Sequence, residues 1–175
     1  AGLVHDGIGG SMPSGLVPNQ ASTQAAYGLG SRSSVLFSPD SRRIAYLAHS
    51  GQTKRVYLDG KAEDVEMDFL VGGMVFSEDS KRLAYGGRRG NKIFLVVDGK
   101  KGADYDALGY SVFSHDGKHM AFAAKKGDQW VIVVDGQERA QYDAVPAGPV
   151  FRPDGVLELL ATDQTSLYRI EVRGF

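Results

Sequence analysis

The sequence lacks several features that would each point to a class of function. It has no cysteine, which excludes disulfides and thiolate chemistry and leaves the redox compartment open. No apolar run approaches the roughly 18 residues of a membrane-spanning helix. The first twenty residues show no basic start followed by an apolar stretch, so no signal peptide is visible. The net charge is −1, without the basic excess that nucleic-acid binding demands.

Glycine is plentiful instead, and its 23 residues suggest many tight turns between short strands. Three sets of anchors repeat along the chain. The first is a phenylalanine at spacings of 39, 37 and 38 residues: Phe37, Phe76, Phe113 and Phe151. The second is an Asp-Gly pair at 59–60, 98–99 and 135–136, and the third is a glycine eight residues before each aspartate, at 51, 90 and 127. Because three independent anchors keep one register, the repeat is real.

Each repeat predicts four short strands. An apolar strand ends at the anchor phenylalanine, and a turn such as "SPDS" leads into a second strand such as "RRIAYLA". A polar loop with the anchor glycine precedes the third strand, and the Asp-Gly pair after it favours a type I′ hairpin turn. A more polar fourth strand follows. Side-chain to backbone bonds in the first turn are expected from a recurring aspartate: Asp40, Asp79, Asp116 and Asp154.

The third strands indicate how the repeats pack. "IFLVV" (93–97) and "WVIVV" (130–134) are apolar throughout, which predicts cover on both faces of the sheet. In a chain made only of strands, that cover comes from neighbouring repeats. Four-stranded antiparallel sheets stacked face to face around an axis provide it, so the predicted fold is an all-β propeller.

The turn segments carry a family resemblance. "FSPDSRRIAY" with "VYLDG", and "FSHDGKHMAF" with "WVIVVDG", resemble WD-repeat-like propeller units of the TolB type, whose hallmark is a Phe-Ser-Pro-Asp-Gly-Lys turn. The resemblance covers roughly residues 21–173. Glu78 and His115 replace the proline, and Arg152 and Val156 replace the serine and the lysine in repeat four. It implies a usually bacterial, periplasmic or secreted propeller for protein contact or beside another domain, but no activity.

The fourth repeat stops after its third strand, while residues 21–27 resemble an isolated fourth strand. We therefore predict that an N-terminal strand completes the last blade, which would remove exposed sheet edges. The predicted division is a flexible leader at 1–20 and a propeller at 21–175, with repeats near 35–71, 72–108, 109–146 and 147–173. A closed four-bladed monomer is favoured. A homodimer of half-rings that exchange N-terminal strands into eight blades, or a fragment of a longer propeller, would satisfy the same pattern.

One end of the predicted propeller gathers charged side chains. In each blade, the loop between strands two and three shares an end with the connection from strand four to the next blade. We expect this end to bind a protein or a small polar ligand such as a sugar or a peptide. Its predicted members are His49, Arg88, Arg89, Lys125, Lys126, Asp68, Asp106, Asp143 and Tyr110.

The leading functional interpretation is a non-catalytic binding or protein-interaction module. The sequence has no Gly-x-Ser-x-Gly nucleophile motif and no calcium-loop pattern, and we expect neither metal nor cofactor. His115 and His119 of "HDGKH" are interpreted as solvated turn residues. Two alternatives use the central channel: a small-ligand binder, or a glycoside hydrolase with Asp68, Asp106 and Asp143 as its carboxylates.

Overall fold

The computed structural model describes residues 3–7 and 35–175, and within these ranges it consists of strands and turns. The strands form four antiparallel sheets of four, which confirms the predicted all-β propeller blades. We call them blade 1 (β2–β5), blade 2 (β6–β9), blade 3 (β10–β13) and blade 4 (β14–β16 with β1). The strands are β1 (Leu3–Gly7), β2 (Val35–Phe37), β3 (Ile44–Ser50), β4 (Thr53–Leu58), β5 (Lys61–Ala62), β6 (Phe69–Phe76), β7 (Leu83–Arg89), β8 (Lys92–Val97), β9 (Lys100–Tyr105), β10 (Ala107–Phe113), β11 (Met120–Lys126), β12 (Gln129–Val134), β13 (Gln137–Tyr142), β14 (Ala144–Phe151), β15 (Leu157–Asp163) and β16 (Ser166–Val172).

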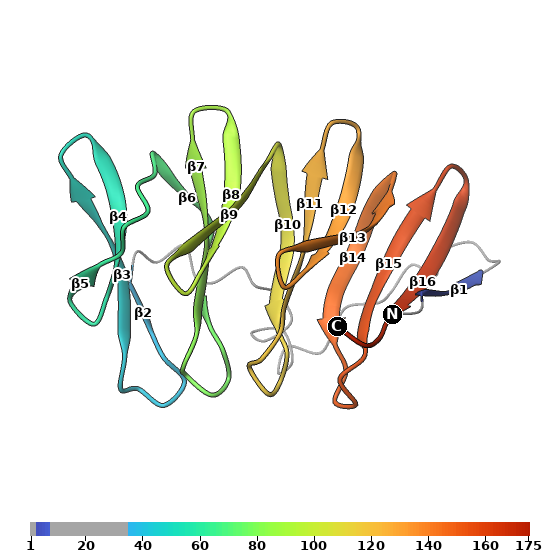
Figure 1. Cartoon of the computed structure of the whole chain (residues 1–175), viewed down its shortest axis with the longest axis horizontal. Helices are drawn as coiled ribbons and strands as arrows, with labels where there is room; N and C mark the ends of the chain where they lie inside the picture. Colours follow the sequence, from blue (N-terminus) through green and yellow to red (C-terminus); the bar gives the residue numbers. More distant parts are fainter. Residues whose placement is uncertain (1–2, 8–34) are drawn as a thin grey trace, which may run out of the picture.

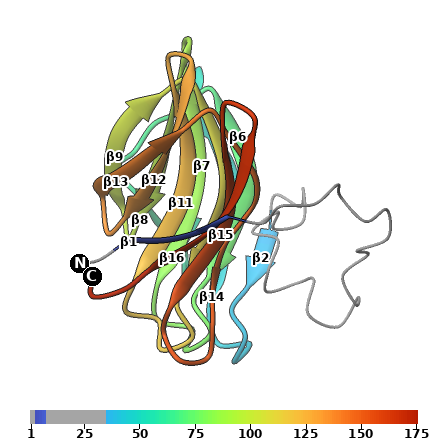
Figure 2. The same cartoon turned by 90° about the vertical axis from the view of Figure 1, so that its right-hand side faces the viewer.

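The four blades stand face to face in a row, with blade 1 at one end and blade 4 at the other (Figure 1). Seen along the row, the sheets lie one behind another with similar strand directions (Figure 2). The row does not close, so the prediction of a closed four-bladed ring is wrong. The oligomeric state stays a prediction. A physical reason for the open row is that the outer face of blade 4 carries ion-paired Glu158, Arg169 and Glu171, whereas the outer face of blade 1 is apolar.

Blade 4 is completed by an N-terminal strand, as predicted. β1 pairs antiparallel with β16, from Leu3 opposite Val172 to Gly7 opposite Tyr168. The segment differs from the one expected, because Leu3–Gly7 lies in the stretch assigned to a leader, while residues 21–27 lie outside the described residues. The sequence "LVHDG" of β1 matches "LVVDG" at 95–99, which ends a third strand. A comparison with fourth strands alone therefore missed it.

Apolar side chains from each pair of neighbouring blades form a core between them. In β8, Phe94 and Val96 pack with blade 1, while Leu95 packs with blade 3. The same alternation in β12 places Val131 against blade 2 and Ile132 against blade 4. The continuous apolar runs are thus covered on both sides, as their pattern predicted.

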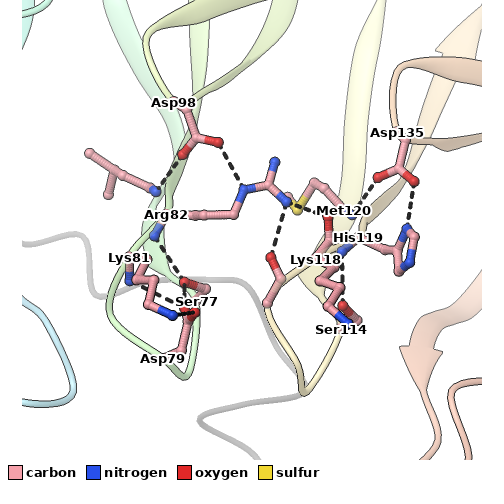
Figure 3. A network of polar contacts seen from close by, with 12 residues as sticks. Ser77, Asp79, Lys81, Arg82, Asp98, Ser114, Lys118, His119, Met120 and Asp135 are labelled. Carbon is pink, nitrogen blue, oxygen red and sulfur yellow. Dashed lines mark hydrogen bonds and ion pairs between the residues drawn. The ribbon is translucent and has the colours of Figure 1, made fainter.

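The turn after the first strand is held by a polar network that we call the turn clamp, drawn for blade 2 in Figure 3. Ser77 Oγ donates to Asp79 Oδ1 at 2.6 Å and accepts from the backbone N–H of Arg82 at 3.0 Å. The Arg82 Nε donates to Asp98 Oδ2 at 2.8 Å. Asp98 and Gly99 have φ of 51° and 74°, as the predicted type I′ turn requires. Asp79 also accepts from the backbone N–H of Lys81, as predicted for the recurring aspartates.

The turn clamp also links neighbouring blades. Arg82 Nη1 donates to the carbonyl oxygens of Gly117 and Lys118 in blade 3, at 3.0 and 2.6 Å. Its guanidinium lies 5.1 Å from the ring centre of Phe113, a cation–π contact. Blade 1 repeats this arrangement toward blade 2, where Arg43 reaches the carbonyls of Ser80 and Lys81 and the ring of Phe76.

Blade 4 lacks the turn clamp. Its turn is one residue shorter, because Phe151 pairs with Leu157 whereas Phe76 pairs with Leu83. The backbone N–H of Arg152 bonds to the Val156 carbonyl, as that of Ser77 bonds to the Arg82 carbonyl. Val156 therefore occupies the position that Arg82 has in blade 2. This corrects the sequence alignment, in which Val156 replaces the lysine of the hallmark turn.

Candidate partner-binding face

Four hairpins lie along one edge of the row: β3–β4, β7–β8, β11–β12 and β15–β16, at the top of Figure 1. The connections from the fourth strand of one blade to the next reach the same edge. We call this edge the loop face. Most of the predicted site residues lie here. His49 pairs with Lys54 beside the first hairpin, Arg89 ends β7, and Lys126 ends β11.

The predicted acids of the loop face hold its loops. The Oδ2 of Asp68 accepts from the backbone N–H of Gly90 at 2.8 Å, and that of Asp106 from Gly127 at 2.8 Å. Asp143 does the same for Gln164 at 2.6 Å. Each aspartate thereby ties the start of a blade to the hairpin of that blade. In blades 2 and 3 the donor of this bond is the anchor glycine, whereas in blade 4 it is Gln164.

Asp106 has a second partner. Lys92 Nζ donates to its Oδ1 at 2.7 Å. This contact, followed by the Gly127 N–H, lowers the pKa of Asp106 below its ordinary value. The carboxylate is thus held in its charged form by groups inside the molecule.

The bases on blades 1 and 2 surround an aromatic side chain that the sequence reasoning missed. Phe69 opens β6 and is 49% exposed. The Arg88 guanidinium lies 4.5 Å and the Lys54 ammonium 4.7 Å from its ring centre. The available signal was that the equivalent positions, each directly after the loop aspartate, are Ala107 and Ala144. A phenylalanine among alanines at an exposed position marks a local departure from the repeat.

The bases on blade 3 are more strongly tied to their own blade. Lys126 Nζ bonds to both carboxylate oxygens of Glu138, each at 3.0 Å. Lys125 is partly buried, whereas His49, Arg88 and Arg89 are exposed. The predicted basic set therefore divides into an exposed group on blades 1 and 2 and a group on blade 3 with an internal ion pair.

Tyr110 does not lie with the others. It sits in the middle of β10, where the pairing with β11 is irregular between Leu108 and Ser111. It lines a cavity of about 210 Å³ between β6 and β10, together with Gly72 and Gly73. The described strands form an open row, so these strands do not enclose the cavity in a central channel.

His115 and His119 lie along the opposite edge of the row from the loop face. His119 takes the place of the clamp arginine, with its Nδ1 2.7 Å from Asp135 Oδ2, and His115 Nδ1 is 2.9 Å from Glu78 Oε1. Both line a pocket of about 340 Å³ between the turns of blades 3 and 4. In the described part of the chain, no three His, Cys, Asp or Glu side chains group as a metal site would require.

A groove of about 350 Å³ lies between blades 2 and 3, lined by Leu95, Tyr105, Met120 and Phe122 and by polar residues of the turn clamp. None of the described segments is a helix that is long and apolar enough to cross a membrane.

Comparisons with known proteins concern the fold. No protein-family model and no curated protein matches the sequence. Among solved structures, TolB from Acinetobacter baumannii is similar over 81% of this chain and 43% of its own, with 15% identity and a TM-score of 0.47. The β-propeller domain of Myceliophteria thermophila Cps50 (Swd1) is similar over 81% of this chain and 51% of its own, with 8% identity and a TM-score of 0.42. The chain thus spans about half the length of these structures.

Proposed function

We propose that this chain is a non-catalytic protein-interaction module that binds a partner through the loop face, at Phe69 and the bases around it. The observation that carries the proposal is the exposed ring of Phe69 between Arg88 and Lys54. Aromatic and arginine side chains dominate the energetics of protein interfaces. An exposed phenylalanine whose ring already contacts two cations offers an apolar anchor beside positive charge.

The charges of the loop face favour an acidic partner. Its recurring aspartates accept hydrogen bonds from the hairpins of their own blades, so their charge serves internal contacts. Arg88 and Arg89 end β7 as exposed side chains, and His49 is an exposed base near the end of β3 on the neighbouring blade. Complementary charge increases the association rate and favours correct partners. The expected partner segment carries carboxylates next to an apolar side chain.

The loop aspartates support this interpretation over a glycoside hydrolase. A general acid in such an enzyme needs a raised pKa, so that it holds a proton near neutral pH. Asp106 has a lowered pKa because Lys92 and the Gly127 N–H stabilise its charged form. Asp68 and Asp143 have a structural role, because each accepts a hydrogen bond from the backbone of the hairpin in its own blade.

The test uses fluorescent peptides of about fifteen residues that combine Glu or Asp with Phe or Leu, and matched peptides in which the acids are replaced by amides. We expect the full chain to bind some of the acidic peptides in anisotropy titrations and to bind their amide versions at least tenfold more weakly. Binding should weaken with added salt, because exposed charges are screened.

Variants then locate the binding site. Phe69→Ala and the double variant Arg88→Ala, Arg89→Ala should each weaken peptide binding about tenfold or more. Arg42→Ala is the matched control, because Arg42 is an exposed base in the turn at the opposite end of blade 1. No binding of any acidic peptide, or an equal loss with Arg42→Ala, would contradict the proposal.

A further inference from the structure

The two ends of the row present sheet faces of opposite character. The outer face of blade 1, turned away from blade 2, carries Val35, Tyr46 and Tyr57 in one cross-strand row and Phe37 opposite Ile44 in the next. The rings of Tyr46 and Tyr57 stack with centres 5.3 Å apart. Phe37 is 63% exposed. We call this surface the open face.

The same positions are buried in blade 2. By register, Val35, Phe37, Ile44, Tyr46 and Tyr57 correspond to an apolar set whose members are all at most 7% exposed, because blade 1 covers them. That set is Met74, Phe76, Leu83, Tyr85 and Val96. The open face therefore keeps the composition of a covered face.

Blade 4 ends the row differently. On its outer face, Glu158 stands opposite Glu171, and Leu160 stands opposite Arg169. The corresponding positions in blade 1 are Ala45 opposite Leu58, and Leu47 opposite Val56, which pack with blade 2.

Ion pairs connect the charges of blade 4. Arg169 bonds to Glu158 at 2.8 Å, and Arg152 bonds to Glu171 at 2.9 Å. A polar outer face is how a terminal repeat meets water. The outer face of blade 4 is therefore suited to contact with water, whereas the outer face of blade 1 resembles the faces that neighbouring blades cover.

The turn of blade 1 also presents carbonyl oxygens that could accept hydrogen bonds from an arginine. In blades 2 and 3, two successive turn carbonyls accept from the arginine of the preceding blade, and the anchor phenylalanine lies beside its guanidinium. In blade 1 the equivalents are the carbonyls of Ser41 and Arg42 and the ring of Phe37. Within the described residues, no donor bonds to these two carbonyl oxygens.

We propose that the open face is a docking surface for a further β-blade of the same repeat type, which presents an aliphatic sheet face and an arginine. The arginine would bond to the Ser41 and Arg42 carbonyls and lie over Phe37, as Arg43 and Arg82 do one and two blades further on. Blade 4 of a second copy does not fit. It offers Glu158 and Glu171 to an apolar face, and it has Val156 where the arginine is needed.

The test supplies such a blade within the full chain. A second copy of residues 69–106 is inserted between Gly30 and Ser31, so that Phe37 follows the copied Asp106 by seven residues, as Phe113 follows Asp106. Phe37→Asp is then made with and without the inserted blade. We expect it to lower the unfolding midpoint of the extended protein by at least ~5 °C, and that of the unmodified chain by ~1 °C or less. Replacing the arginine of the inserted copy by Ala should also lower the midpoint of the extended protein.

Val150→Asp is the matched control, because Val150 is 39% exposed on blade 4 and should respond equally in both proteins. Three results would overturn the proposal. The first is an equal response to Phe37→Asp with and without the inserted blade. The second is an extended protein that fails to unfold as one cooperative unit. The third is an unmodified chain that forms a dimer which Phe37→Asp dissociates, because the open face would then join two copies of this chain.

Discussion

Blades 2 and 4 share one strand order but secure their turns in different ways. In blade 2, Arg82 joins Asp98 of its own blade to two carbonyls of blade 3. In blade 4, Arg152 bonds within the blade, to Asp154 and Glu171. The strand pattern is therefore enough to build a blade, whereas the turn clamp is a separate device that couples one blade to the next.

The largest expected effect breaks the clamp of blade 2. Arg82→Ala removes the ion pair with Asp98, two bonds to carbonyls of blade 3 and the contact with the Phe113 ring. We expect a loss of about 2–3 kcal/mol in the free energy of unfolding, since hydrogen bonds from charged groups contribute more than neutral ones. Urea denaturation measures it. Arg169→Ala in blade 4 is the control and should cost at most about 1 kcal/mol, because its ion pairs lie at an exposed face. Equal losses would contradict a coupling role for the clamp.

A second prediction concerns the loss of folding stability at low pH. The Ser114 hydroxyl, followed by the Lys118 backbone N–H, lowers the pKa of Asp116 to about 2. A carboxylate with a folded pKa below its unfolded value of about 3.8 stabilises the fold above pH ~4, and this contribution is lost as the pH falls through about 2. Ser114→Ala should raise the pKa of Asp116 toward the ordinary value and reduce this acid-dependent loss. An NMR titration of the Asp116 carboxyl carbon tests it, and an unchanged midpoint would refute the assigned cause.

A smaller effect concerns the loop face. Asp106→Ala removes the acceptor for the Gly127 N–H, so the exchange of that amide with solvent should become faster. The Gly90 amide is the internal control, because it is bonded to Asp68 in another blade. Hydrogen exchange followed by NMR resolves both amides. If both accelerate equally, the aspartate has a global effect and does not simply hold one hairpin.

The smallest expected effect lies in the backbone of the first turn. Ser41 adopts φ of 59°, a left-handed conformation, while Gly155 fills the equivalent position in blade 4. Ser41→Gly should stabilise the protein by about 0.5 kcal/mol, because a residue without a Cβ avoids the steric cost there. Gly155→Ser should destabilise it by a similar amount. Thermal unfolding compares the two, and changes of the same sign would contradict the explanation.

Much of the fold followed from the sequence because the repeat keeps three anchors in one register. The Asp-Gly turns, the recurring aspartate of the first turn and the two-sided cover of β8 and β12 all agree with the prediction. These features depend on neighbours close in the chain or on a simple alternation. They are the kind of information that a single sequence contains.

The open row and the exposed anchor on the loop face were harder to predict. Whether the row closes depends on how the outer face of blade 4 meets that of blade 1, and the charges of Glu158, Arg169 and Glu171 become visible as a face only once the register of β15 and β16 is known. Phe69 lies just beyond Asp68, where attention to charge alone passed over an aromatic residue. The sequence was enough to place most of the predicted bases and acids along one edge of the row. The hydrogen bonds that the acids make within their own blades could be recognised only in the structure. Their role as a partner surface stays a prediction.

One distance measurement tests directly whether the row of blades is open. The chain has no cysteine, so pairs of spin labels can be attached at introduced cysteines without further changes. Labels at Arg42 and Pro153 report on the turns of blades 1 and 4, and labels at Arg42 and Lys81 report on neighbouring blades. Because stacked sheets lie roughly 10 Å apart, the open row predicts a 42–153 distance at least about 20 Å longer than the 42–81 distance. Equal distances for the two pairs would instead indicate a closed ring, in which blades 1 and 4 are neighbours.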